Sequence, residues 1–82
     1  MKIYGYTNGE VMNANVASDE LAEISLIATP IELRRIASFL STCATNMEAM
    51  GSNYSHEHLS DRDPLFKLSP HFVVLPPDEN AA

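Results

Sequence analysis

The chain has 82 residues, of which 45% are hydrophobic and 20% are charged, so it suits a single small globular domain. Five Lys and Arg against eleven Asp and Glu give a net charge of −6, and the sequence pI is about 4.7. These few scattered cations exclude a basic groove for nucleic-acid phosphates. A membrane-spanning helix is excluded too, because it needs about 20 consecutive apolar residues and no run approaches that length.

The cysteine content and the N-terminus indicate the compartment. Cys43 is the only cysteine, so no internal disulfide forms, and a free thiol suits a reducing environment. The opening MKIYGYTNGE lacks the apolar stretch of a signal peptide. We therefore expect a cytoplasmic protein with a single domain over residues 1–77 and a frayed C-terminal tail over residues 78–82.

Two short strands are predicted before the helix. Residues 2–6 (KIYGY) are rich in aromatic and β-branched side chains, and residues 21–28 (LAEISLIA) alternate as a half-buried strand does. A helix over residues 19–28 is the competing interpretation, but the stop at Pro30 favours a strand. Between the strands, residues 8–19 carry turn-forming and polar side chains and are predicted to be a connection.

The clearest local signal is the start of a helix. Thr29 stands at the N-cap, Pro30 at the first helical position and Glu32 at the third, which is the pattern of a capping box. An apolar stripe follows at spacings of three and four, formed by Ile36, Leu40, Cys43, Met47 and Met50 and widened by Leu33, Ala37, Phe39 and Ala44. Since Gly51 suits the residue after a helix, the sequence predicts a helix over residues 30–50.

The chain after the helix is predicted to be a long connection and a last strand. Residues 51–69 are polar and lack sustained periodicity, and such a long connection in a compact domain is often functional. Pro64 predicts a helical turn near residues 63–66. Residues 71–75 (HFVVL) lie between prolines and are predicted to form a strand with apolar side chains on both faces.

The predicted fold class is therefore α+β. One long amphipathic helix cannot bury its apolar stripe alone, so it must pack on a sheet. We expect a small antiparallel sheet of about three strands (β-β-α-β) packed against the helix, with the first strand between the other two.

The acidity is confined to the segments that flank the helix. Residues 1–28 and residues 52–82 each carry a net charge of −3, whereas residues 29–51 are neutral. Excess negative charge in connections favours electrostatic steering toward a basic partner. The alternative is that the charge serves solubility alone.

The densest set of candidate metal ligands lies in the polar connection. In extended backbone His56 and His58 point to the same side, and with Asp61 or His71 they are candidate zinc ligands. The spacing is not the His-Glu-x-x-His of a helical zinc site, so we predict neither a metal nor another cofactor. In the alternative interpretation the His and Asp residues of this loop make turn and capping hydrogen bonds.

No residue pattern predicts an enzyme. Cys43 falls within the apolar stripe of the helix, so we interpret it as a core residue rather than a nucleophile. No Gly-x-Ser-x-Gly turn and no phosphate-binding loop occur. We therefore expect no catalytic residues.

Several segments together resemble a family. They are the opening MKIYGY, the segment EISLIATPIELRRIASFL, a Met-rich helix end at Gly51, the stretch SHEHLSD at 55–61 and the ending PHFVV at 70–74. This combination resembles a small family of immunity proteins from bacterial polymorphic toxin systems, the thirty-second such family, over roughly residues 20–75. The resemblance implies a cytoplasmic protein that binds and neutralises a cognate toxin, and it assigns no site residues.

Our first hypothesis is thus an immunity protein that occludes its toxin stoichiometrically. The contacts are predicted to come from the 52–66 connection, through Tyr54, His56, Glu57, His58, Asp61 and Asp63. Two alternatives stay open. One is a small metal-binding (zinc) or regulatory protein that uses His56 and His58, and the other is a structural or oligomerising domain that pairs through an exposed sheet edge.

Overall fold

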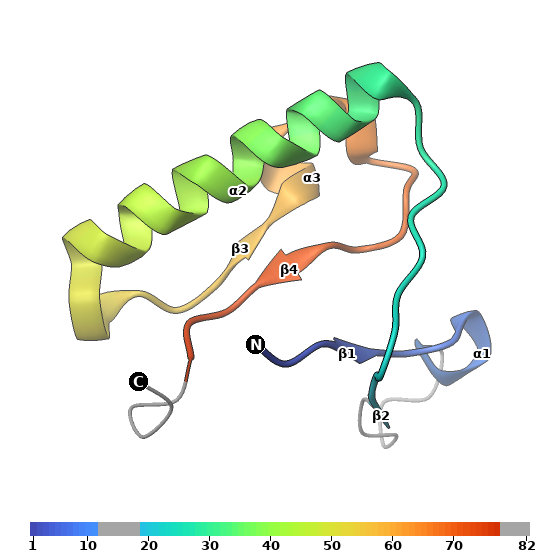
Figure 1. Cartoon of the computed structure of the whole chain (residues 1–82), viewed down its shortest axis with the longest axis horizontal. Helices are drawn as coiled ribbons and strands as arrows, with labels where there is room; N and C mark the ends of the chain where they lie inside the picture. Colours follow the sequence, from blue (N-terminus) through green and yellow to red (C-terminus); the bar gives the residue numbers. More distant parts are fainter. Residues whose placement is uncertain (12–18, 78–82) are drawn as a thin grey trace.

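The computed structural model of the chain describes residues 1–11 and 19–77. The predicted tail over residues 78–82 lies outside the described residues. The elements in chain order are β1 (Tyr4–Gly5), α1 (Asn8–Val11), β2 (Asp19–Glu20), α2 (Pro30–Met50), a 3₁₀ helix (Gly51–Asn53), β3 (Glu57–His58), α3 (Leu59–Arg62), a second 3₁₀ helix (Pro64–Phe66) and β4 (Val73–Val74) (Figure 1). The class is α+β, and the long helix α2 lies across one side of β3 and β4 (Figure 1).

Helix α2 has the predicted bounds, and the capping box explains its start. The Thr29 backbone N–H donates to Glu32 Oε1 at 2.8 Å, and the Glu32 N–H donates to Thr29 Oγ1 at 3.2 Å. The hydrogen bond from the Thr29 backbone holds the pKa of the Glu32 carboxyl below its ordinary value. At the other end Gly51 has a φ of 55°, a left-handed conformation that favours glycine.

The core lies on a line of α2 that is displaced from the predicted stripe. Ile36, Phe39 and Cys43 are buried, whereas Leu40 is 43% exposed and Met50 is 48% exposed. The expectation that Leu40 and Met50 face the core is wrong, because the helix turns the positions i, i+3 and i+7 toward its neighbours. Those neighbours are Leu59 of α3 and Phe66 of the second 3₁₀ helix, with Phe72 and Val74 partly buried against them.

The predicted three-stranded sheet is replaced by two separate two-stranded antiparallel sheets. Tyr4 pairs with Glu20 and Gly5 pairs with Asp19 in the first sheet, β1–β2. In the second sheet β4 pairs with β3 and does not lie beside β1. Strand β3 lies within the connection over residues 51–69, for which the sequence predicts no regular structure. No alternation of apolar side chains in this connection indicates a strand.

The predicted strand over residues 21–28 is also wrong in the structure. This segment is extended, but its only backbone hydrogen bond is from Leu21 N–H to the Ile3 carbonyl at 2.6 Å, among the residues that the structure describes. Its alternating pattern is that of a strand, yet no strand in the described part of the chain pairs with it. In Figure 1 it runs from β2 up to the start of α2.

The 51–69 connection contains more regular structure than expected. Two 3₁₀ helices, β3 and α3 all fall within it. The predicted helical turn near Pro64 is confirmed, and the Asp63 side chain caps it by accepting from Leu65 N–H at 3.0 Å. The strand predicted over residues 71–75 is confirmed only for Val73–Val74.

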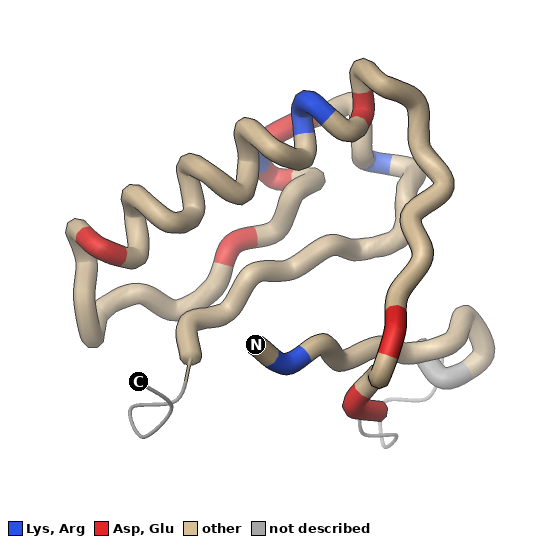
Figure 2. Tube along the Cα trace, in the orientation of Figure 1, with Lys and Arg blue, Asp and Glu red and all other residues tan. Residues whose placement is uncertain are grey.

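In the structure, as in the sequence, the acidic residues are concentrated outside the long helix. Figure 2 shows acidic residues around β2 and around β3 and α3, whereas α2 carries both signs. Within the described part of the chain, no helix combines the length and the apolar character that crossing a membrane requires.

Candidate partner-binding site at β3 and α3

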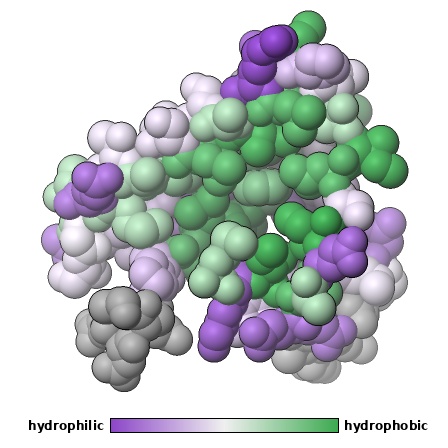
Figure 3. All heavy atoms as spheres, viewed as in Figure 1, coloured by the Kyte–Doolittle hydropathy of each residue, from purple (hydrophilic) through white to green (hydrophobic). Residues whose placement is uncertain are grey.

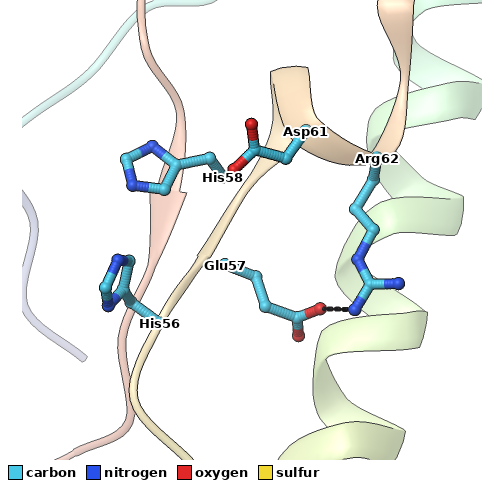
Figure 4. A pocket seen from close by; sticks show the side chains of 5 residues that line it. All are labelled: His56, Glu57, His58, Asp61 and Arg62. Atoms are coloured by element: carbon cyan, nitrogen blue, oxygen red, sulfur yellow. Dashed lines mark hydrogen bonds and ion pairs between the residues drawn. The ribbon is translucent and has the colours of Figure 1, made fainter.

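Successive side chains in and just before β3 point in opposite directions, as they do in any extended segment. Figure 4 shows His56 and His58 on one side of the strand and Glu57 on the other, pointing toward α2 and Arg62. This separation follows from the period of two in a strand, so the expectation that the two histidines share a side is confirmed. One side of β3 is thus anchored to the fold, and the other presents imidazole rings.

The Glu57 carboxylate is the anchor. Its Oε1 accepts from Asn46 Nδ2 at 3.1 Å and from Arg62 Nη2 at 2.5 Å, and its Oε2 accepts from the Tyr54 hydroxyl at 2.9 Å. Burial favours the neutral acid, but the hydrogen bonds from Tyr54, Arg62 and Asn46 outweigh it and hold the pKa of Glu57 below its ordinary value. The carboxylate therefore joins α2, β3 and α3 as a charged acceptor.

Two buried groups, the Tyr54 hydroxyl and the Cys43 thiol, lie near the Glu57 carboxylate on its buried side. Tyr54 is 5% exposed, and burial together with its hydrogen bond to Glu57 raises the pKa of its hydroxyl. Cys43 is 1% exposed, and burial raises the pKa of its thiol, in agreement with its predicted place in the core. Both groups stay neutral at pH 7, which suits structural roles.

The three histidines of the chain form a row. The ring centroids of His56 and His58 are 5.2 Å apart, and those of His58 and His71 are 6.2 Å apart, both edge to face. His58 pairs with Val73 in the antiparallel register of β3 and β4. This pairing brings His71, which precedes β4, close to His58. With Asp61 of α3, these residues make up what we call the histidine face: His56, His58, His71 and Asp61.

A hollow of about 390 Å³ opens beside this face. It is lined by His56, Glu57, His58, Asp61 and Arg62. The Asp61 carboxylate has no hydrogen bond or ion pair with any residue that the structure describes, and neither do the ring nitrogens of His58. His56 Nδ1 lies 2.8 Å from the Ser55 hydroxyl oxygen. The face thus offers one unpaired negative charge and imidazole nitrogens to a ligand.

The neighbouring Asp63 serves the fold instead. Its Oδ1 caps the second 3₁₀ helix, and its Oδ2 lies 3.4 Å from Arg35 Nε on α2. Its side chain is only 20% exposed. This is the capping role that the alternative interpretation of the loop gave to its aspartates.

The six residues predicted to contact a partner therefore fall into two groups. Tyr54, Glu57 and Asp63 point into the fold and hold it, whereas His56, His58 and Asp61 are available at the surface. Their contact with a partner stays a prediction. The four candidate metal ligands, His56, His58, Asp61 and His71, are neighbours, but within residues 1–11 and 19–77 no three His, Cys, Asp or Glu side chains are grouped as a metal site requires.

Two residues of the site were not predicted from the sequence. Asn46 lies on α2, and Arg62 lies at the end of α3, and both donate to Glu57. The signal for Asn46 was its place beside the apolar stripe, where a polar side chain needs a partner. The signal for Arg62 was its spacing of five residues from Glu57, which a short turn after the strand can close.

Comparison of the chain with known protein families, with curated proteins and with solved structures finds no match.

Proposed function

We propose that the protein is an immunity protein that neutralises a cognate bacterial toxin by binding it, with the histidine face as the contact. The observation that carries the proposal is the arrangement of His56, His58 and Asp61. Their side chains lie together at the surface, around a hollow, with polar groups that the described part of the fold does not use. The sequence resemblance supports the same class.

The rigidity of the backbone below the face favours binding. The Glu57 anchor, the β3–β4 pairing and α3 already hold this loop in place. Binding a partner therefore costs little conformational entropy for ordering the loop. Leu59 N–H also donates to the Phe72 carbonyl at 2.9 Å, which ties α3 to the segment before β4 that carries His71. The exposed groups are thus preorganised for a partner.

The charge balance indicates the chemistry of that partner. Glu57 is paired with Arg62, and Asp63 is paired with Arg35, so Asp61 is the carboxylate of this region whose charge has no neighbouring compensation among the described residues. Imidazole nitrogens and a free carboxylate suit Lys, Arg and hydroxyl donors. The expected contact is therefore a basic or polar surface, such as the one a nuclease toxin uses for its substrate.

Co-expression tests this function. The probe is the product of each reading frame that flanks this gene, placed under an inducible promoter in a host that lacks the protein and screened first for growth arrest. The chain should restore growth when the toxin is induced, and the two proteins should copurify in a one-to-one complex. Growth arrest that the chain leaves unchanged would contradict the proposal.

Charge-reversal variants locate the contact. Asp61→Lys should lose protection, whereas Glu48→Lys, which makes the same charge change on the exposed surface of α2, should keep it. Equal protection by both variants would place the toxin contact elsewhere on the molecule.

A further inference from the structure

The histidine face holds every histidine of the chain. The sequence has three histidines, and the structure places them in one row, with ring centroids 5.2 Å apart for His56 and His58 and 6.2 Å apart for His58 and His71. Imidazole is the side chain that ordinarily changes its charge between about pH 5 and about pH 8. The response of the side chains to pH near neutrality is therefore concentrated on this one surface.

The charged neighbours of the row leave one negative charge uncompensated. Three charged residues line the hollow beside the imidazoles: Glu57 of β3 and Asp61 and Arg62 of α3. Glu57 and Arg62 are paired with each other, and Asp63 after α3 is paired with Arg35 of α2. Strand β4, which pairs with β3, consists of two valines and adds no charge. Among the described residues, Asp61 alone therefore gives the hollow its negative sign.

Protons on the row reverse this sign. One protonated imidazole cancels the charge of Asp61, and a second makes the face positive. The rings are spaced more closely than the Debye length of about 8 Å at physiological salt, so their charges act on a partner as a single patch. The rings of His56 and His71 belong to exposed residues, so water supplies the protons directly.

We propose that the histidine row is a pH switch for the partner contact, which holds a basic surface while the imidazoles are neutral and repels it once they are protonated. The switch rests on the proposed function, in which the partner surface is basic or polar. It needs no movement of the backbone. The pKa of Glu57 lies below its ordinary value, so the anchor keeps its charge and its hydrogen bonds on both sides of the switch.

Proton uptake by the row is tested on the isolated protein. Nuclear magnetic resonance follows the carbon-bound protons of each imidazole ring from about pH 8 to about pH 5. Two or more of the three rings should become protonated over this range while the backbone amide resonances of β3 and α3 keep their dispersion. Rings that stay neutral down to about pH 5 would overturn the switch, whatever partner the protein binds.

The effect on binding is tested with the product of the flanking reading frame that arrests growth. Its dissociation constant, measured by biolayer interferometry, should rise roughly tenfold or more between about pH 7.5 and about pH 5.5. The triple variant His56→Gln, His58→Gln, His71→Gln keeps polar, uncharged side chains, and its constant should change by less than about threefold. Because the partner is the same in both series, the difference between them belongs to the histidines of this chain.

The double variant His56→Gln, His71→Gln guards against a loss of folding, because it alters only exposed residues and keeps the half-buried His58. It should retain the circular dichroism of the unaltered protein and show a smaller pH effect. A constant that is equal at both pH values would overturn the switch and leave the contact standing. A pH effect of the same size in the unaltered protein and in both variants would place it in the partner and overturn the switch. Absence of binding at both pH values would overturn the contact and the switch together.

Discussion

The Glu57 carboxylate determines which way the side chains of β3 point. Its three donors come from α2, from the turn before β3 and from α3, so it fixes the backbone that carries His56 and His58. The sequence predicts that the two histidines share a side, because that follows from the period of a strand. It does not predict the anchor, because Asn46 lies 11 residues away and is brought near only by the tertiary fold.

The Tyr54 hydroxyl should contribute measurably to stability. Tyr54→Phe removes a partly buried hydrogen bond to a charged acceptor and should lower the free energy of unfolding by about 1.5 kcal/mol. Urea unfolding followed by circular dichroism measures the change. Tyr6→Phe is the control, since Tyr6 is 53% exposed and its change should have little effect. Equal stability of the two variants would contradict the role given to Tyr54.

The lowered pKa of Glu57 predicts a dependence of stability on pH. The unfolded chain binds this proton more tightly than the folded protein does, so the carboxylate stabilises the fold above its ordinary pKa of 4.5. That contribution is lost as the pH falls through the lowered value. Urea midpoints measured from about pH 7 to about pH 3 should therefore fall less steeply for Glu57→Gln than for the unaltered protein. Parallel curves would count against the anchor.

Helix α2 and the β3–β4 pair differ in how much of each the sequence predicts. The helix bounds follow from local chemistry at Thr29, Pro30, Glu32 and Gly51, which acts without the rest of the fold. The pairing of β3 with β4 joins segments that are 15 residues or more apart, and β3 has no apolar alternation. Conversely, the segment over residues 21–28 has the alternation of a strand, but beyond Leu21 it makes no backbone hydrogen bond with the described residues. Local pattern predicts the conformation of a segment but not its partner.

The side of α2 that faces the core can be tested by comparing substitutions at Phe39 and Leu40. Phe39 is 5% exposed, and its ring centroid lies 6.3 Å from that of Phe72 in an edge-to-face contact, whereas its neighbour Leu40 is largely at the surface. Phe39→Ala should lower the free energy of unfolding by about 3–5 kcal/mol. Leu40→Ala should change it less, by about 1 kcal/mol, because Leu40 is 43% exposed and lies outside the buried core cluster. Urea unfolding of both variants compares them directly, and the reverse order of effects would show that the predicted stripe faces the core.

For the whole molecule, the acidity and the apolar surface belong to different regions. The histidine face lies at β3 and α3, and the extended segment over residues 21–28, with its exposed Ile24, Leu26 and Ile27, lies between β2 and α2 (Figure 1, Figure 3). Within the described residues, Asp61 supplies the unpaired negative charge of the histidine face, because the other two carboxylates of this region, Glu57 and Asp63, form ion pairs.

The measurement that tests the histidine face most directly is the rate at which the protein associates with the proposed toxin, recorded by stopped flow at several salt concentrations. Asp61→Lys should slow association roughly tenfold at low salt and flatten the salt dependence, since a favourable charge becomes repulsive. Glu48→Lys, with the same net charge, should associate at nearly the unaltered rate. An association rate that Asp61→Lys leaves unchanged, or that both variants reduce equally, would contradict a contact at this face.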